Sequence, residues 1–104
     1  MKIETLSYEF IEVGDIKLHV ATGGSGTPLV LLHGFPETHV AWRYVVPELL
    51  KNYTVVCPDL RGYGRSDKPH GDETHSNYSK RTMAKDIREL MKKLGHDRFA
   101  VAGH

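Results

Sequence analysis

The sequence predicts an α/β fold with a mainly parallel sheet, and two observations carry this prediction. Short apolar runs rich in β-branched residues alternate along the chain with stretches whose apolar residues recur at helical spacing. Such runs are typical of strands buried on both faces of a parallel sheet, and the alternation implies right-handed crossovers. At 104 residues, 39% of them hydrophobic and 26% charged, the chain has the balance of one globular domain or part of one.

The chain begins with a predicted β-hairpin. Residues 8–13 and 16–20 alternate apolar and polar side chains, and Gly14-Asp15 between them suits a short turn. After a glycine-rich segment, residues 28–32 form a continuous apolar run, which favours a central strand.

A helix is expected after Thr38, whose hydroxyl can cap the first turn. Pro47 lacks a backbone N–H group, so this helix should break or restart near Val46. The apolar positions that define the helix are Trp42, Val45, Leu49 and Leu50. Residues 53–57 are β-branched and precede Pro58, which predicts a second buried strand.

Residues 59–77 are expected to be mostly loop. Ser79 then caps the most regular predicted helix, and Gly95 ends it. The apolar side chains of this helix are Met83, Ile87, Leu90, Met91 and Leu94. Residues 99–102 form a third apolar strand, so the predicted order is hairpin, strand, helix, strand, helix, strand.

Composition argues against several kinds of partner. The formal net charge of +1 creates no field that would attract nucleic acid or an anionic membrane. No apolar stretch approaches the roughly 18 residues of a spanning helix, and the N-terminus has no signal-peptide pattern. Cys57 is the only cysteine, so no intramolecular disulfide is possible. These observations predict a soluble, cytoplasmic protein.

Nucleotide and metal sites are disfavoured as well. The glycine-rich segments 23–26 and 62–64 complete no phosphate-binding motif, and Asp67 stands where a third glycine would be needed. The seven histidines form no H-x-x-x-H pair, and Cys57 has no cysteine neighbour. We therefore expect no cofactor and no metal.

Motifs follow each of the three apolar strands. The last is the start of a nucleophile elbow, a pattern of small residue, any residue, nucleophile, any residue, small residue, in which Gly103 is first and His104 second. Together the motifs resemble those of the α/β-hydrolase superfamily, and most closely its haloacetate dehalogenase and epoxide hydrolase branch. The residues that carry the resemblance are His33-Gly34-Phe35-Pro36-Glu37-Thr38, Trp42, Asp59-Leu60-Arg61-Gly62-Tyr63-Gly64-Arg65-Ser66-Asp67-Lys68-Pro69, Tyr78-Ser79-Lys80-Arg81-Thr82-Met83-Ala84 and Ala102-Gly103-His104.

The resemblance implies an eight-stranded sheet, of which this chain holds the first five strands. Residues 1–104 would be the N-terminal portion of a single core domain, without its cap domain and C-terminal half. In that branch an Asp at the elbow displaces halide from a saturated carbon, and a His-activated water hydrolyses the resulting ester. The nucleophile is expected immediately after His104, so the chain holds no catalytic side chain and should be inactive alone.

Phe35 is the residue expected to contact the reacting group. By the resemblance, its backbone N–H and the N–H after the nucleophile form the oxyanion hole, with Gly34 and Pro36 beside it. A cis bond before Pro36 would aim the Phe35 amide into the site. Structural roles are implied for His33, which should bond toward the 59–64 loop, and for Trp42, Asp59, Arg61, Gly62, Gly64, Gly103 and His104.

Alternative functions stay open at this point. A haloacid and an epoxide are both suitable small organic substrates, because the residues that separate the two activities lie beyond His104. An elbow that continues Asp-Arg-Gly would favour either activity, whereas Ser would favour an esterase, lipase or peroxidase. A non-catalytic truncated product or half of a heteromer is the alternative from another class. The strand 99–102 would then be an unpaired edge and both sheet faces would lack covering helices, so we expect aggregation, a complementing chain or poor folding.

Overall fold

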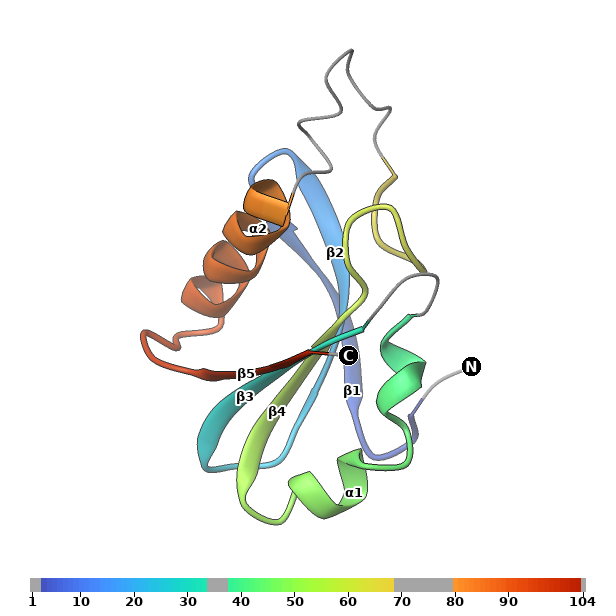
Figure 1. Cartoon of the computed structure of the whole chain (residues 1–104), viewed down its shortest axis with the longest axis vertical. Helices are drawn as coiled ribbons and strands as arrows, with labels where there is room; N and C mark the ends of the chain where they lie inside the picture. The colour runs from blue at the N-terminus through green and yellow to red at the C-terminus, as the bar shows by residue number, and fades with distance from the viewer. Residues whose placement is uncertain (1–2, 34–37, 69–79, 104) are drawn as a thin grey trace.

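The computed structural model describes residues 3–33, 38–68 and 80–103 of the chain. Along the sequence it contains β1 (Ser7–Val13), β2 (Ile16–Gly23), β3 (Thr27–Leu32), the 3-10 helix η1 (His39–Trp42), α1 (Val46–Leu49), β4 (Tyr53–Pro58), α2 (Lys80–Lys93) and β5 (Ala100–Gly103). Within the described residues the strands form one mixed sheet in the order β1-β2-β4-β3-β5 (Figure 1). The predicted α/β class and the predicted order of elements are confirmed.

The sheet has an antiparallel half and a parallel half. β1 and β2 form the predicted hairpin around Gly14, whose φ of 60° suits a residue without a side chain. β2 also pairs antiparallel with β4, whereas β3 lies parallel to both β4 and β5. β2 extends to Gly23, three residues beyond the expected end, and β5 begins one residue later than expected.

The first helical segment is interrupted where Pro47 predicts. Thr38 caps η1 by accepting a hydrogen bond from the Val40 amide at 3.4 Å. The helix restarts as α1 with Pro47 in its first turn, where a missing N–H costs no hydrogen bond. The prediction that Val45 belongs to the apolar face of this helix is wrong. Val45 is 43% exposed, because it lies in the turn between the two helices.

α2 ends at the glycine predicted to stop it. Gly95 has a φ of 88°, and its amide donates to the carbonyl of Lys92 at 3.0 Å. The next amide, of His96, reaches back to the carbonyl of Met91 at 2.8 Å, which completes a Schellman motif. The predicted cap, Ser79, lies outside the described residues.

Helices pack on both faces of the sheet. On one face Ile87, Leu90 and Met91 of α2 pack against a core that includes Val30 and Val56. On the other face Val46 of α1 packs against the intervening strand positions, among them Leu29, Leu31, Val55 and Cys57. The expectation that both faces lack covering helices is therefore wrong, because the two crossovers place one helical segment on each face.

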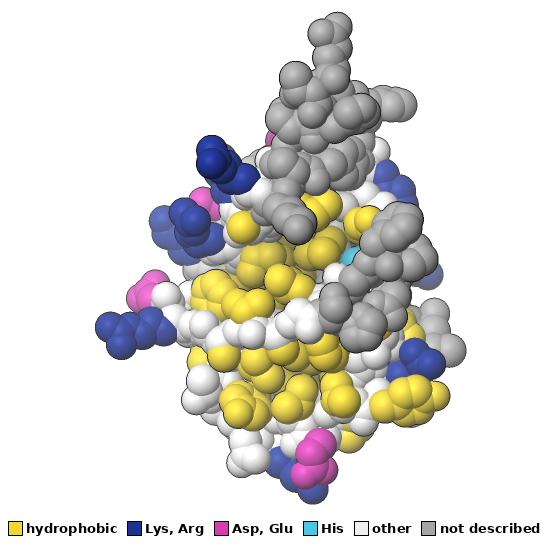
Figure 2. Space-filling model, in the orientation of Figure 1, with side chains coloured by type: hydrophobic (Ala, Val, Ile, Leu, Met, Phe, Trp, Pro, Cys, Tyr) yellow, Lys and Arg dark blue, Asp and Glu magenta, His cyan; other side chains and the backbone are white. Residues whose placement is uncertain are grey.

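β5 is an edge strand of the described sheet, as expected. Figure 2 shows hydrophobic side chains exposed on both sides of the band where β5 crosses the front of the molecule. Val101 is 55% exposed, and an apolar cavity of about 470 Å³ separates β5 from α2. Among the described helices, none has the length and apolar character needed to cross a bilayer.

Candidate active site

The carboxyl ends of the parallel strands meet at one edge of the sheet. Leu32, the last residue of β3, is paired with Gly103, the last residue of β5. The chain therefore leaves β3 and β5 at the same edge of the sheet. Ligands of open α/β sheets bind outside the carboxyl ends of the strands. The predicted oxyanion residues Phe35, Gly34 and Pro36, and the elbow residue His104, lie outside the described residues.

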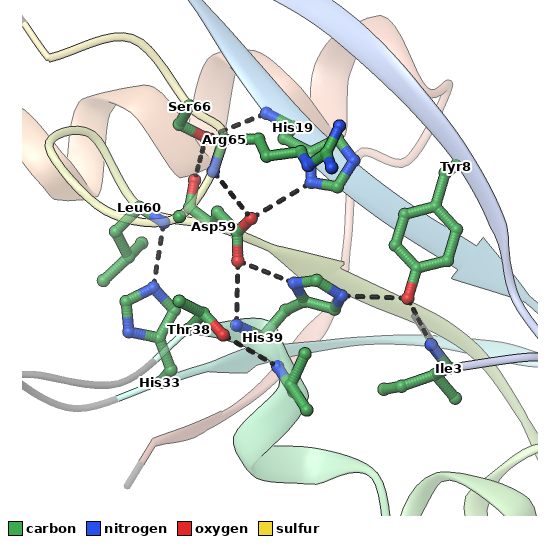
Figure 3. Close-up of polar contacts among 12 residues, drawn as sticks. Ile3, Tyr8, His19, His33, Thr38, His39, Asp59, Leu60, Arg65 and Ser66 are labelled. Carbon is green, nitrogen blue, oxygen red and sulfur yellow. Dashed lines mark hydrogen bonds and ion pairs between the residues drawn. The ribbon is translucent and has the colours of Figure 1, made fainter. Parts of the chain in front are cut away.

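His33 connects the end of β3 to the loop after β4. Its side chain is buried, and its Nε2 accepts a hydrogen bond from the Leu60 amide at 3.0 Å (Figure 3). The ring also lies edge-on to Tyr63, with centroids 5.2 Å apart. This is the hydrogen bond expected from the sequence. Because the Leu60 amide occupies the Nε2 lone pair, His33 is poorly suited to act as a base.

Asp59 is the centre of a buried cluster that the sequence analysis did not identify. One carboxylate oxygen, Oδ1, accepts hydrogen bonds from both the backbone amide and Nδ1 of His39, at 2.8 and 2.7 Å. The other, Oδ2, accepts from Nδ1 of His19 at 3.0 Å and from the Arg65 amide at 3.3 Å. Figure 3 shows the carboxylate between the two imidazole rings.

The hydrogen bonds keep this carboxylate ionised. Burial by itself would raise the pKa of Asp59, but the bonds from His39 and His19 outweigh burial and hold the pKa below its usual range. Since an ionised carboxylate only accepts hydrogen bonds, Nδ1 of each histidine carries a proton. On the other side of the His39 ring, Nε2 lies 2.9 Å from the hydroxyl of Tyr8.

Ser66 and Asp67 attach the loop after β4 to β2. The hydroxyl of Ser66 donates to the Asp59 carbonyl at 2.5 Å and accepts from the His19 amide at 2.8 Å. Asp67 accepts from the Lys17 amide at 2.9 Å. Gly64 has a φ of 53° and lies so close to Asp59 that a Cβ atom there would be 2.3 Å from Oδ2.

Other predicted site residues lie around this loop. Arg61 is buried and forms two bonds with Asp86 of α2, from Nε at 2.6 Å and from Nη2 at 2.8 Å. Gly62, with a φ of 85°, donates to the Asp67 carbonyl at 2.9 Å. Trp42 is partly buried against the core on the α1 face. These contacts suit the structural roles implied for the loop, and those roles stay predictions.

The cluster also contains possible metal ligands. Nδ1 of His19, Nδ1 of His39 and a carboxylate oxygen of Asp59 lie within 4.8 Å of one another, beside a cavity of about 390 Å³. Both Nδ1 atoms already donate protons to the carboxylate, so the group is satisfied as a hydrogen-bond network without an ion. No local motif could identify it, because His39 and His19 are 20 and 40 residues from Asp59.

The fold and the strand-end geometry define an α/β hydrolase core, and comparison with known proteins agrees. Residues 27–104 match the family described as alpha/beta hydrolase fold. A crystal structure of a Nostoc sp PCC 7120 protein assigned to the α/β hydrolases superposes with a TM-score of 0.96 at 44% identity, covering 99% of this chain and 35% of that one. The chain therefore belongs to the α/β hydrolase family.

Within this family the chain is similar to enzymes of two activities. It is 52% identical to the fluoroacetate dehalogenase of a Burkholderia species, over 97% of this chain and 33% of that protein. It is 48% identical to the soluble epoxide hydrolase of Corynebacterium sp. (strain C12), over 88% of this chain and 30% of that protein. The chain thus spans about a third of the length of these relatives.

Proposed function

We propose that this chain is the N-terminal part of a hydrolase that opens a carbon–halogen bond of a small haloacid. The pairing of Leu32 with Gly103 supports the proposal, because the two strands that precede the proposed oxyanion segment and the proposed nucleophile elbow end side by side. The identity of 52% to a fluoroacetate dehalogenase favours this substrate class. We place the protein in the cytoplasm, without a cofactor.

The proposed chemistry proceeds in two steps. A carboxylate that follows His104 attacks the halogen-bearing carbon, forms a C–O bond and expels halide with the electron pair of the broken bond. A histidine-activated water then adds to the carbonyl of the ester, and the amide of Phe35 stabilises the oxyanion that develops. Collapse of the tetrahedral species breaks the bond between the acyl carbon and the ester oxygen, which leaves with a proton as the hydroxyl of the product, and regenerates the carboxylate. The 104 residues alone should not turn over substrate, because nucleophile, acid and base come later in the family's order.

Epoxide hydrolysis is the second candidate, favoured by the identity of 48% to a soluble epoxide hydrolase. The two substrates differ in the leaving group, since an epoxide retains its oxygen as an alcohol and releases no halide. A non-catalytic truncated product, or one half of a heteromer, remains the alternative from another class.

The test compares both substrates with the full-length protein that contains this chain. We expect fluoride release from fluoroacetate, followed with a fluoride electrode, to exceed diol formation from an epoxide at equal enzyme concentration. Diol formation without fluoride release would establish the epoxide hydrolase instead. Lack of turnover with both substrates, while the protein is folded, would favour the non-catalytic alternative.

A matched pair of variants tests the role of Phe35. Phe35→Pro removes the backbone N–H group, whereas Phe35→Ala keeps it and shortens the side chain. Loss of one oxyanion donor typically lowers kcat by about 100- to 1,000-fold. We expect a loss of this size in Phe35→Pro relative to Phe35→Ala, and equal activity of the two variants would exclude the amide from the oxyanion hole.

A further inference from the structure

A cavity of about 390 Å³ beside the Asp59 cluster is lined by two positive side chains. Arg43, from the turn after η1, and Arg65, from the loop after β4, are both exposed. Asp59 is the negative group among the described lining residues, but it is 1% exposed and four N–H groups occupy its oxygens. The charge that remains available to a ligand in this cavity is therefore positive.

Both guanidinium groups keep donors for a ligand. Nη1 of Arg43 donates to the Val40 carbonyl at 3.0 Å, and the group lies 4.5 Å from the centroid of the Tyr44 ring. These contacts hold the side chain and leave most of its N–H groups without a bond to a described residue. Arg65 uses its backbone amide to bond Asp59 at 3.3 Å, and its guanidinium forms no hydrogen bond or ion pair within the described ranges. Two guanidinium groups at one cavity are typical of a site that binds an oxyanion.

His19 contributes a hydrogen-bond acceptor to the same cavity. The ring is 6% exposed, and Tyr8 and Phe10 lie against it with centroids 5.2 and 5.0 Å away. Its Nδ1 donates to Oδ2 of Asp59 at 3.0 Å (Figure 3), so in the neutral ring the lone pair is on Nε2. Nε2 has no hydrogen-bond partner in the part of the chain that the structure describes. Because buried polar atoms are nearly always hydrogen-bonded, we expect a group that donates a hydrogen bond to occupy this position.

Two positive donors and one neutral acceptor select among small anions. The oxygens of an oxyanion accept hydrogen bonds from guanidinium groups, whereas Nε2 of His19 requires a ligand that can donate one. Inorganic phosphate keeps at least one P–OH group at neutral pH and so satisfies both kinds of partner. Sulfate and simple carboxylates are fully deprotonated at this pH, so their oxygens would face the Nε2 lone pair and leave it unpaired.

We propose that this cavity binds inorganic hydrogen phosphate, with Arg43 and Arg65 as donors to its oxygens and Nε2 of His19 as the acceptor of its P–OH group. Asp59 holds His19 in the tautomer that accepts, and its own oxygens are already occupied. The proposal is independent of the proposed function, because none of these side chains has a part in the hydrolysis described above. Phosphate binding is therefore expected whichever of the two substrates the protein turns over.

Isothermal titration calorimetry of the full-length protein that contains this chain tests the ligand. Sodium phosphate and sodium sulfate are titrated separately at neutral pH and equal ionic strength. We expect phosphate to bind with a Kd at least about 10-fold below that of sulfate, because sulfate leaves Nε2 of His19 without a donor. Equal Kd values would overturn the proposal, as would a lack of phosphate binding up to about 10 mM.

Substitution of an exposed arginine tests the location. Arg65→Gln removes the positive charge but keeps the backbone amide that bonds Asp59, and we expect both anions to bind at least about 10-fold more weakly. Arg98→Gln is the matched control, because Arg98 is exposed beside the amino end of β5, whereas the cavity lies at the carboxyl end of β4. Its phosphate Kd should stay within about twofold of the wild type. Unchanged phosphate binding by Arg65→Gln would overturn the proposal.

His19→Asn tests the acceptor. The amide nitrogen of Asn lies near the place of Nδ1 in histidine and can keep the bond to Asp59, while no atom replaces Nε2. We expect the preference for phosphate over sulfate to fall to within about threefold in this variant, and a preference that stays near 10-fold would overturn the proposal. Melting temperatures without phosphate show whether each variant is folded. Phosphate should raise the melting temperature of the wild type and Arg98→Gln but not that of Arg65→Gln.

Discussion

Asp59 accepts hydrogen bonds with both carboxylate oxygens, from His39, His19 and Arg65. An ionised carboxylate offers about four acceptor positions, and four N–H groups of these residues occupy them. These four bonds supply the hydrogen-bond partners that a charge buried beside an apolar core requires. They also leave no room for additional atoms on the side where Gly64 approaches.

Gly64→Ala should be strongly destabilising. The new Cβ would meet Oδ2 of Asp59 at 2.3 Å, and a φ of 53° is unfavourable for any side chain. We expect a loss of about 2–4 kcal/mol in the free energy of unfolding, from backbone strain and overpacking together. Gly14→Ala is the control, because its φ is 60° with nothing within 4 Å of the Cβ position, and it should lose only about 1 kcal/mol. Urea unfolding measures both, and similar losses would show that the contact with Asp59 contributes nothing.

The low pKa of Asp59 makes the stability sensitive to acid. The folded-state pKa is below the unfolded value of 3.8, so the unfolded chain binds the proton more readily. The stabilisation is therefore complete well above pH 3.8 and is lost as the pH falls below that value. Asp59→Asn lacks this titration, so we expect the stability difference between wild type and variant to shrink between pH 6 and pH 3. A stability difference for Asp59→Asn that stays constant over this pH range would contradict the assignment.

At the scale of elements, α2 is joined to the loop after β4 by the pair Arg61 and Asp86. Both side chains are buried, at 4% and 8% relative exposure, and the guanidinium donates to both carboxylate oxygens. Removing Asp86 would take away two short hydrogen bonds of the buried guanidinium, and breaking a buried pair typically costs about 3–5 kcal/mol. The pair therefore ties α2 to the loop that follows β4.

We expect Asp86→Ala to lower the free energy of unfolding by about 3–5 kcal/mol. The double variant Arg61→Met, Asp86→Leu should be less destabilised than Asp86→Ala, because it leaves no buried charge. A double-mutant cycle in urea measures the coupling energy. Independent, additive effects of the two positions would show that the pair is not coupled.

For the molecule as a whole, local patterns predict elements better than they predict contacts between elements. The apolar runs of β3, β4 and β5 and the Gly95 stop of α2 are short-range signals, and the structure confirms each of them. The strand order needs contacts between distant segments, and so does the pairing of His19 with Asp59. Such contacts between residues far apart in the sequence cannot be predicted from local sequence patterns. The roles assigned to Phe35, Gly34, Pro36 and His104 depend on residues outside the described ranges and stay predictions.

The exposed side of β5 should make the 104-residue chain self-associate. An unpaired edge strand recruits further strands, and Val101 presents an apolar side chain there at 55% exposure. We expect the sedimentation coefficient of the purified chain to rise with concentration between about 10 and 200 µM, a range in which weak associations of this kind are populated. Val101→Lys should suppress this rise, because charge on an edge disfavours pairing. A wild-type chain that stays monomeric throughout would contradict the prediction.

The chain leaves β3 toward the α1 face and leaves β4 toward the α2 face. In open α/β sheets, ligands bind outside the strand ends where connections part in this way. The topology therefore favours the location of a binding site independently of which catalytic residues occupy the loops. New chemistry requires only different residues in the loops, and relatives that cleave a carbon–halogen bond or open an oxirane are two outcomes of the same architecture.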